Sequence, residues 1–324
     1  MPLLVLSGSD VRELLSYAEC ATVMRSALAD LARGEIEQPL RSVVRPAGAA
    51  GFQVLMPSYA GIAGYGLKAL VITPGNPARG LDAHQGGVML FAAETGEPVA
   101  LINASALTEI RTAAVSAVAT GLLARPDASL AAIIGTGVQG AAHARALAAT
   151  RPLAGIRLYG RSSRTAALAA ALAQELDVPV TASPSAAAAV DGAGIVVTAT
   201  SSATPVIARD WLAPGTHVNA VGACVPSDRE IDAATMAEAA IFTDSVESLE
   251  NEAGDYVLAV KDGAQVSPAR ATLGELLAGT GQGRGHQHEI TLFESLGLAA
   301  EDLMAASFVY QKAVRLQMGV TADF

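Results

Sequence analysis

The sequence has little of several residue types, and each shortage excludes a class of protein. Only two of its 324 residues are cysteine, Cys20 and Cys224, so neither a disulfide framework nor a cysteine-rich zinc site is available. Lys and Arg number 21 against 31 Asp and Glu, and this acidic balance argues against nucleic acid or anionic membranes as partners. No uninterrupted apolar run reaches about 18 residues, which argues against a membrane span. The first residues lack the basic segment of a secretory signal, so we expect a cytoplasmic protein.

What the chain does have is apolar residues, 51% of the total, against 16% charged residues. Over 324 residues this balance predicts a globular protein of about two domains. Apolar residues at helical spacing predict helices over 9–33 and 106–124. Between them, short runs separated by Gly, Pro and Asn predict the strands of a mixed or antiparallel sheet, at 41–45, 52–57, 64–72, 86–92 and 98–103.

A second domain is predicted to begin after the Pro-containing step at Arg125-Pro126. From there, strand-like and helix-like segments alternate, which predicts an α/β fold with a doubly wound parallel sheet. The last segment is one more amphipathic helix, and we expect it to return to the first domain. The predicted domains are therefore 1–125, joined by 300–324, and 126–299.

A glycine motif begins the second domain. Gly135, Gly137 and Gly140 form G-x-G-x-x-G directly after an apolar strand and at the start of an Ala-rich helix. In that context the first glycine permits a tight turn, the second lets the backbone approach a pyrophosphate, and the third lets helix and strand pack closely. The motif therefore predicts a dinucleotide site, with the intervening residues as further contacts, at Thr136, Val138 and Gln139.

The end of the second predicted strand bears on the choice of dinucleotide. An NAD site usually has an Asp or Glu there, but this strand is followed by Gly160, Arg161, Ser162 and Arg164 with no acid. Arginine and hydroxyl groups suit a 2′-phosphate, since they form charge-assisted hydrogen bonds with it. We therefore predict a preference for NADPH, with NADH as the alternative.

Three cations stand in the largely apolar first domain, at Arg41, Lys68 and Arg111. Arginine gives a two-pronged grip on a carboxylate, and lysine supplies a point charge and a proton donor. These residues are candidates for a carboxylate site, although an exposed ion-pairing role for each taken singly stays open.

Several segments, in this order, resemble the ornithine cyclodeaminase/mu-crystallin family: GLKALVITPGN, the long block that contains LTEIRTAA, IIGTGVQG, HVNAVGA and FESLGLAAEDL. The resemblance runs over nearly the whole chain. It implies a homodimer, with a Rossmann domain and a mixed α+β substrate-binding and dimerisation domain built from both ends of the chain.

The resemblance also implies roles for residues. Arg41 and Arg111 would hold the substrate carboxylate, Lys68 would lie beside the reacting carbon as the catalytic residue, and Thr112 would lie next to the cofactor phosphates. The segment after the last strand of the sheet would line the nicotinamide pocket, at Ser295, Leu296 and Gly297. The predicted cofactor contacts are completed by Thr200, Ser201 and Val221.

One departure from the family's pattern changes the expected reaction. Cyclodeaminases have an aspartate after the HVNA strand, where this chain has Cys224, and Asp228 looks like a helix-start residue. The segment instead resembles the reductase branch, which implies NAD(P)H-dependent reduction of a cyclic or linear imino acid, such as pyrroline-2-carboxylate or piperideine-2-carboxylate, to an L-amino acid. Cys224 is then expected only to shape the pocket.

Two alternatives stay open: an amino-acid dehydrogenase or ornithine/lysine cyclodeaminase, and a non-catalytic protein that binds NADPH and a small ligand, as mu-crystallin-like proteins do. No metal is expected, because His286 and His288 have no suitable acid cluster beside them.

Overall fold

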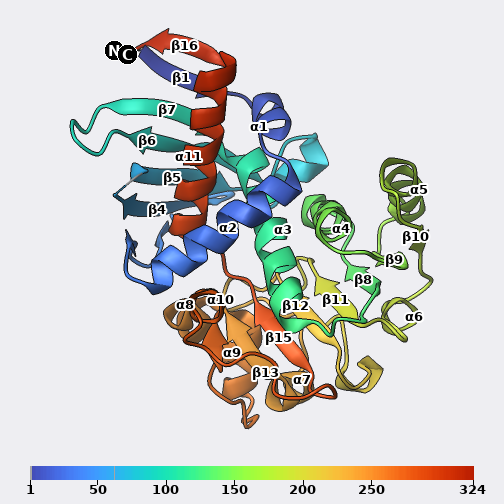
Figure 1. Ribbon diagram of the computed structural model, residues 1–324. Coiled ribbons are helices and arrows are strands. Elements are labelled where there is room, and N and C mark those ends of the chain that lie inside the picture. The colour runs from blue at the N-terminus through green and yellow to red at the C-terminus, as the bar shows by residue number, and fades with distance from the viewer. Residues whose placement is uncertain (1, 62) are drawn as a thin grey trace. The chain divides into compact units, whose positions relative to one another are not determined.

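The structure is a computed structural model that describes residues 2–61 and 63–324. The chain divides into two compact units (Figure 1). Unit 1 holds the described residues up to Arg111 together with Gly297–Phe324, and unit 2 is Thr112–Leu296. Helix α3 (Ala104–Leu123) continues through the first boundary. The boundaries therefore differ from the sequence-based ones, since the first falls inside this helix and the second falls after Leu296, between β15 and α11.

Unit 1 is built on a mixed sheet in the order β16-β1-β7-β6-β5-β4-β2, with β3 paired to β4. All pairs are antiparallel except β1 with β7. The strands are β1 (Pro2–Leu6), β2 (Ile36–Glu37), β3 (Ser42–Val44), β4 (Phe52–Ala60), β5 (Gly64–Ile72), β6 (His84–Phe91), β7 (Pro98–Asn103) and β16 (Val320–Asp323). The five strands predicted from the sequence are confirmed.

The N-terminal helix predicted over 9–33 is two helices, α1 (Gly8–Leu14) and α2 (Tyr17–Ala32). The break occurs at Ser16, whose hydroxyl accepts from the Glu19 amide while the Glu19 carboxylate accepts from the Ser16 amide. This reciprocal capping box begins a new helix.

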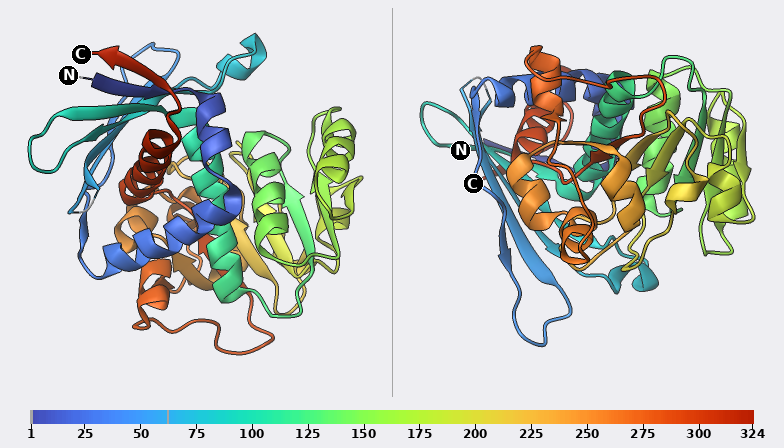
Figure 2. Two further views of the ribbon diagram at one scale, coloured as in Figure 1. Left: turned by 45° about the horizontal axis from the view of Figure 1, so that its top comes forward. Right: turned by 90° about the horizontal axis from the view of Figure 1, so that it is seen from below.

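Helix α11 (Ala299–Leu316) returns from the C-terminal part of the chain and packs on α2 and on strands β4 to β6 (Figure 2). Val54, Met56 and Leu70 form a buried apolar cluster with Ala299 at the start of α11. The final helix thus covers one face of the sheet of unit 1, as the sequence predicted. The short 3-10 helix η1 (Asn76–Arg79) lies between β5 and β6.

Unit 2 is a parallel sheet in the order β10-β9-β8-β11-β12-β15-β13-β14. Its strands are β8 (Leu130–Ile134), β9 (Gly155–Tyr159), β10 (Val180–Ala182), β11 (Ile195–Thr198), β12 (His217–Ala220), β13 (Ala240–Thr243), β14 (Ala271–Thr272) and β15 (Thr291–Glu294). The helices are α4 (Val138–Thr150), α5 (Thr165–Glu175), α6 (Ala186–Val190), η2 (Arg209–Trp211), α7 (Ala233–Glu238), α8 (Val246–Glu252), α9 (Gly254–Lys261) and α10 (Leu273–Ala278). The predicted fold class, a doubly wound α/β unit and a mixed unit, is confirmed.

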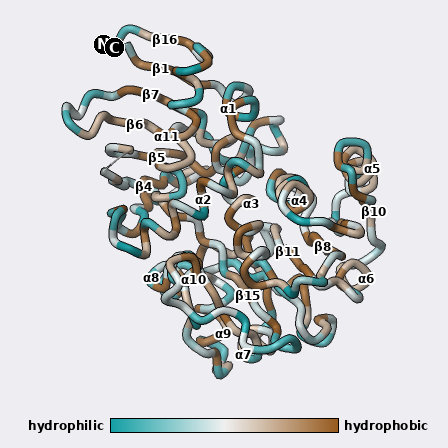
Figure 3. The backbone as a smooth tube through the Cα atoms, viewed as in Figure 1, coloured by the Kyte–Doolittle hydropathy of each residue, from teal (hydrophilic) through white to brown (hydrophobic). Residues whose placement is uncertain are grey.

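Helix α3 is apolar along most of its length (Figure 3). Its length and composition match a membrane span, but 78% of its most apolar window is buried inside the protein. An all-round apolar helix with such burial is typical of a protein core.

Candidate active site

Lys68 lies in the middle of β5, on the face of the sheet that α11 covers. Side chains alternate across a strand, and Gly66, Lys68 and Leu70 are the buried set. A Cβ on Gly66 would lie 2.9 Å from the Leu303 side chain, so α11 passes close to the strand at this point. The alternation therefore directs a lysine into the interior of unit 1, where it is 3% exposed.

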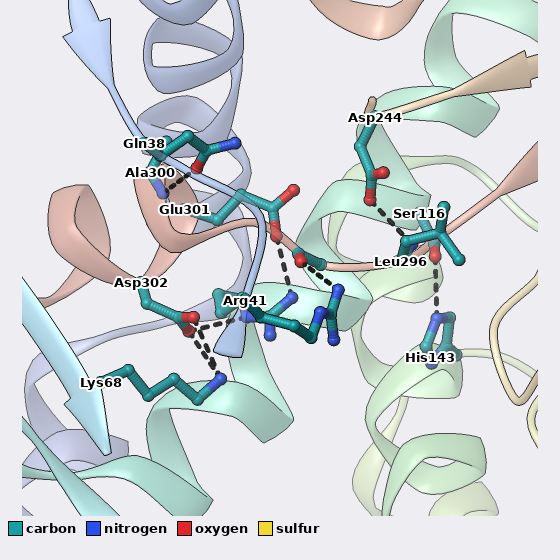
Figure 4. A network of polar contacts seen from close by, with 12 residues as sticks. Gln38, Arg41, Lys68, Ser116, His143, Asp244, Leu296, Ala300, Glu301 and Asp302 are labelled. Carbon is teal, nitrogen blue, oxygen red and sulfur yellow. Dashed lines mark hydrogen bonds and ion pairs between the residues drawn. The ribbon is translucent and has the colours of Figure 1, made fainter. Parts of the chain in front are cut away.

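Asp302 is the counter-ion of Lys68. It belongs to the first turn of α11, and each of its carboxylate oxygens accepts from Lys68 Nζ at 3.0 Å (Figure 4). The carboxylate is 1% exposed. A negative charge in the first helical turn is also favoured by the helix dipole.

Arg111 joins the same cluster from α3. Its Nε donates to Asp302 Oδ1 at 2.9 Å, and its Nη1 donates to Glu301 Oε2 at 2.8 Å. Asp302 thus connects Lys68 to Arg111, and all four charged groups are buried. Burial of ions is costly unless each is paired, so this pairing is needed for the cluster to exist in the interior.

Arg41 reaches the cluster from the segment before β3. Its Nη2 donates to the Gly297 carbonyl at 2.9 Å. Gly297 has φ +76°, and a Cβ there would lie 2.5 Å from Arg111 Nη1, so only glycine fits beside the guanidinium. Gln38 holds the same segment to α11, because its Oε1 accepts from the Ala300 amide at 2.8 Å (Figure 4).

Burial and neighbouring charge set the proton affinity of the cluster. Burial lowers the pKa of Lys68 to about 8; Asp302 opposes this shift, while Arg111 and Arg41 add to it. The pKa of His84, at the start of β6, is lowered by loss of solvent and by the charges of Lys68 and Arg111. A lysine with this pKa gives up a proton near neutral pH far more readily than an exposed lysine.

The glycine turn of unit 2 has the form that a bound dinucleotide requires. Gly135 is buried with φ +119°, and its Cβ would lie 2.3 Å from the Ala199 carbonyl oxygen. A Cβ on Gly140 would lie 1.9 Å from the Gly135 carbonyl oxygen, whereas one on Gly137 would meet nothing within 4 Å. Gly137 is the N-cap of helix α4 and provides no side-chain hydrogen bond to the helix start. The backbone is therefore tightly packed at Gly135 and Gly140 and open at Gly137, where a phosphate approaches the helix N-terminus. These residues fit a bound dinucleotide.

The other predicted cofactor residues of unit 2 lie at the carboxyl ends of its strands or at the helix starts. Gly160 adjoins Thr136, since its Cβ would lie 2.3 Å from Thr136 Oγ1. Arg161, Ser162 and Arg164 are exposed after β9. Val138 and Gln139 form the first turn of α4, and Thr200, Ser201 and Val221 follow β11 and β12. In α3, Thr112 Oγ1 is buried with no hydrogen-bond partner among the described residues.

Comparison with known proteins identifies the family of the chain. The family model for the ornithine cyclodeaminase/mu-crystallin family matches residues 2–317. The chain belongs to this family. The resemblance inferred from the sequence is therefore confirmed.

Two curated members of the ornithine cyclodeaminase/mu-crystallin family have names that specify a reaction. The delta(1)-pyrroline-2-carboxylate reductase of Bacillus cereus is 35% identical over 99% of this chain and 100% of its own length. The ketimine reductase mu-crystallin of Mus musculus is 34% identical over 94% of this chain and 96% of its own. A solved structure, the delta(1)-pyrroline-2-carboxylate reductase of Thermococcus litoralis with NADH and L-proline, has a TM-score of 0.95 at 33% identity and covers 99% of this chain and 100% of that one.

In the present protein, the remaining predicted pocket residues belong to unit 2. Ser295 and Leu296 follow β15 and are buried, and the Leu296 amide donates to Asp244 Oδ2 at 2.8 Å. Cys224 is half-buried and packs against an apolar cluster. Of the predicted substrate residues, unit 1 brings together Arg41, Lys68, Arg111 and Gly297.

Two acids of this cluster, Glu301 and Asp302, were not among the residues predicted from the sequence. The signal was present: Asp302 lies on the apolar stripe of the final helix, with Ala306 and Val309. An acid on a buried helix face implies a buried cation opposite it.

Proposed function

We propose that this protein reduces the C=N bond of a small imino acid to an L-amino acid with a reduced nicotinamide cofactor. The observation that carries the proposal is the buried Lys68 ammonium group, which shares the Asp302 carboxylate with Arg111. Such a cluster offers a proton donor beside cations that bind a carboxylate. The names of the two relatives and of the Thermococcus litoralis structure specify this reaction class.

The bound cofactor supplies a hydride to the imine carbon, and the residues of unit 1 supply the rest. Lys68 donates a proton to the imine nitrogen, so that hydride and proton together convert C=N to CH–NH and leave Lys68 neutral. Arg111 and Asp302 fix the position of Nζ, and solvent restores the proton. A lysine is suited to this step when its pKa lies near the working pH.

The carboxylate of the substrate is assigned to Arg41 and Arg111. Arg41 is half-buried and lies at the edge of the cluster, whereas Lys68 and Arg111 are buried. Holding the carboxylate fixes the imine carbon and nitrogen, and this loss of rotational freedom is itself a source of rate. A five- or six-membered cyclic imine with an adjacent carboxylate, as in pyrroline-2-carboxylate or piperideine-2-carboxylate, meets these demands.

The cofactor is a nicotinamide dinucleotide, and we propose that NADPH is preferred over NADH. Support comes from Arg161 and Arg164, exposed after β9, for which the described part of the chain shows no ion pair. No acid follows Tyr159 to bind a ribose 2′-hydroxyl. Two unpaired guanidinium groups suit a 2′-phosphate.

We further propose a homodimer that forms through the face of the sheet of unit 1 opposite α11. The β5 side chains on that face are Tyr65, Leu67, Ala69 and Val71, and Tyr65 and Val71 are 50% and 41% exposed. Tyr65 pairs with Tyr59 of β4, with ring centroids 4.7 Å apart. An apolar sheet face of this kind is typical of a protein interface. Light scattering should give a dimer mass, and Val71→Lys should shift it to the monomer.

The direct test of the activity is incubation with NADPH and pyrroline-2-carboxylate or piperideine-2-carboxylate, following loss of the reduced nicotinamide absorbance. We expect oxidation of the cofactor with formation of L-proline or L-pipecolate. Release of ammonia from ornithine or lysine, without oxidation of NADPH by either imine, would instead identify a cyclodeaminase. Tight NADPH binding without turnover of any imine would identify a non-catalytic binding protein.

A further inference from the structure

Glu230 is a buried acid in the loop between β12 and α7 of unit 2. Its side chain is 0% exposed. Its Oε1 accepts from the Thr200 amide at 2.6 Å, and its Oε2 accepts from the Gly222 amide at 2.6 Å. Thr200 lies in the loop after β11 and Gly222 in the loop after β12. One carboxylate thus connects two neighbouring loops at the carboxyl edge of the parallel sheet.

A second buried acid holds Glu230 in place. Asp255, in the first turn of α9, accepts from the Glu230 amide at 2.7 Å and from the Ile231 amide at 2.8 Å, both at Oδ1. No lysine or arginine forms an ion pair with Glu230 or Asp255 in the part of the chain that the structure describes. These two acids are therefore held by backbone amides rather than by counter-ions.

The same loops touch the glycine turn. A Cβ on Gly222 would lie 2.1 Å from the Thr200 carbonyl oxygen and 2.6 Å from Glu230 Cδ. A Cβ on Gly135 would lie 2.3 Å from the Ala199 carbonyl oxygen and 3.2 Å from Thr200 Cγ2. Close contacts therefore run from the first glycine of the motif through the Ala199–Thr200 segment and the Glu230 side chain to Gly222.

In a doubly wound sheet, dinucleotides bind outside the carboxyl ends of the strands, one nucleotide on each half of the sheet. The half formed by β8, β9 and β10 carries the glycine motif and Arg161, and corresponds to the adenosine part of the cofactor. The half formed by β11, β12 and β15 carries the two loops that Glu230 connects, and corresponds to the nicotinamide part. Glu230 is thus bonded to two loops of the second half, those after β11 and β12.

We propose that Glu230 is a positioning residue of the cofactor site, whose carboxylate fixes the Thr200 and Gly222 loops for the nicotinamide half of the dinucleotide. The proposal rests on the proposed use of a nicotinamide cofactor. Both oxygens of Glu230 accept an amide proton, an arrangement that suits a carboxylate. Burial raises the pKa of Glu230, and these two amide bonds oppose the shift. Nearby Glu294 is buried, and burial together with the charges of Asp255, Glu230 and Asp244 raises its pKa.

The test compares Glu230→Gln with the wild-type protein by titration with two ligands. NADPH occupies both halves of the site, whereas 2′,5′-ADP occupies only the adenosine half. Glutamine keeps the shape but has a single acceptor oxygen, and its NH₂ group faces an amide N–H. We expect the Kd for NADPH to rise about tenfold or more, as for loss of a charge-assisted hydrogen bond, and the Kd for 2′,5′-ADP to stay unchanged.

Glu238→Gln is the matched control, because Glu238 is an exposed acid of unit 2 that pairs with Arg209 at the surface. It should leave both Kd values at their wild-type level. If Glu230→Gln does not fold, Gly222→Ala serves as the second variant, since its methyl group separates the same loops without a change of charge. It should weaken NADPH binding and spare 2′,5′-ADP.

Equal losses for the two ligands, or wild-type affinity for NADPH in the folded variant, would overturn the positioning role. Failure of the wild-type protein to bind either NADPH or NADH would overturn the proposed cofactor itself. The wild-type titration therefore distinguishes the two proposals.

Discussion

Asp302 Oδ1 accepts both from Lys68 Nζ at 3.0 Å and from Arg111 Nε at 2.9 Å. The three residues come from α11, β5 and α3 and lie far apart in the sequence. The buried cluster therefore exists only when the C-terminal helix has returned to the N-terminal sheet. Its two acids offset the cost of burying the lysine and arginine charges, and the cations are thereby kept in position for the carboxylate of the proposed substrate.

Lys68→Met should lower kcat for imine reduction by about 10²–10⁴-fold, the range for loss of a general acid. Methionine fills the space of the lysine stem, and Asp302 keeps its bond from Arg111, so the fold should persist. The Kd for NADPH should not change. Steady-state kinetics and cofactor titration measure the two effects separately.

Lys312→Met is the matched control for this variant. Lys312 belongs to α11 and pairs with Glu19 at the surface of unit 1. The kcat of Lys312→Met should equal the wild-type value. If the kcat of Lys68→Met lay within a factor of a few of the wild-type value, Lys68 would not be the proton donor.

Gly297→Ala should raise the KM for the imino acid and lower thermal stability. The residue has φ +76°, where a side chain costs about 1–2 kcal/mol, and the new methyl group would lie 2.5 Å from Arg111 Nη1. The guanidinium must move, and its grip on the substrate carboxylate weakens. Gly263→Ala, at φ +85° with nothing within 4 Å, carries the backbone cost alone and should leave KM unchanged. A wild-type KM for the imino acid in Gly297→Ala as well as in Gly263→Ala would show that Arg111 does not bind the substrate.

Arg161→Ala should raise the KM for NADPH about ten- to a hundredfold and leave the KM for NADH nearly unchanged, because only NADPH carries the 2′-phosphate. Arg145→Ala is the control, since Arg145 pairs with Glu175 on the surface of the same unit. Equal KM values for the two cofactors in the wild-type protein would contradict the predicted preference.

Most of the fold could be predicted from the sequence because its periodicities are strong. The alternation in 64–72 predicted β5, and the glycine motif between strand and helix predicted the β8–α4 turn. The break at Ser16 was missed, since apolar spacing continues across it and only the Ser16-x-x-Glu19 pair signals a new helix. Strands β1 and β16 were missed as well. They are short and pair with each other from opposite ends of the chain, which local patterns do not reveal.

The candidate site was predictable in part, for a related reason. Arg41, Lys68 and Arg111 stand out as cations in apolar surroundings, and the resemblance to the family gave them roles. Asp302 did not stand out, because an acid in the first turn of a helix is ordinary on the grounds of the helix dipole alone. Its pairing with Lys68 depends on where α11 packs. Glu230 was missed because its partners are backbone amides, which leave no trace in a sequence.

The pH dependence of kcat at saturating imine, for the wild-type protein and Asp302→Asn, tests the central claim most directly. Lys68 donates a proton only while charged, and burial lowers its pKa to about 8, so kcat should fall as the pH rises through this value. The charge of Asp302 raises the pKa of Lys68, and its removal should therefore move the fall in kcat to a lower pH. A wild-type kcat that stays constant well above pH 8, or a fall at the same pH in both proteins, would contradict the role of Lys68 as the proton donor.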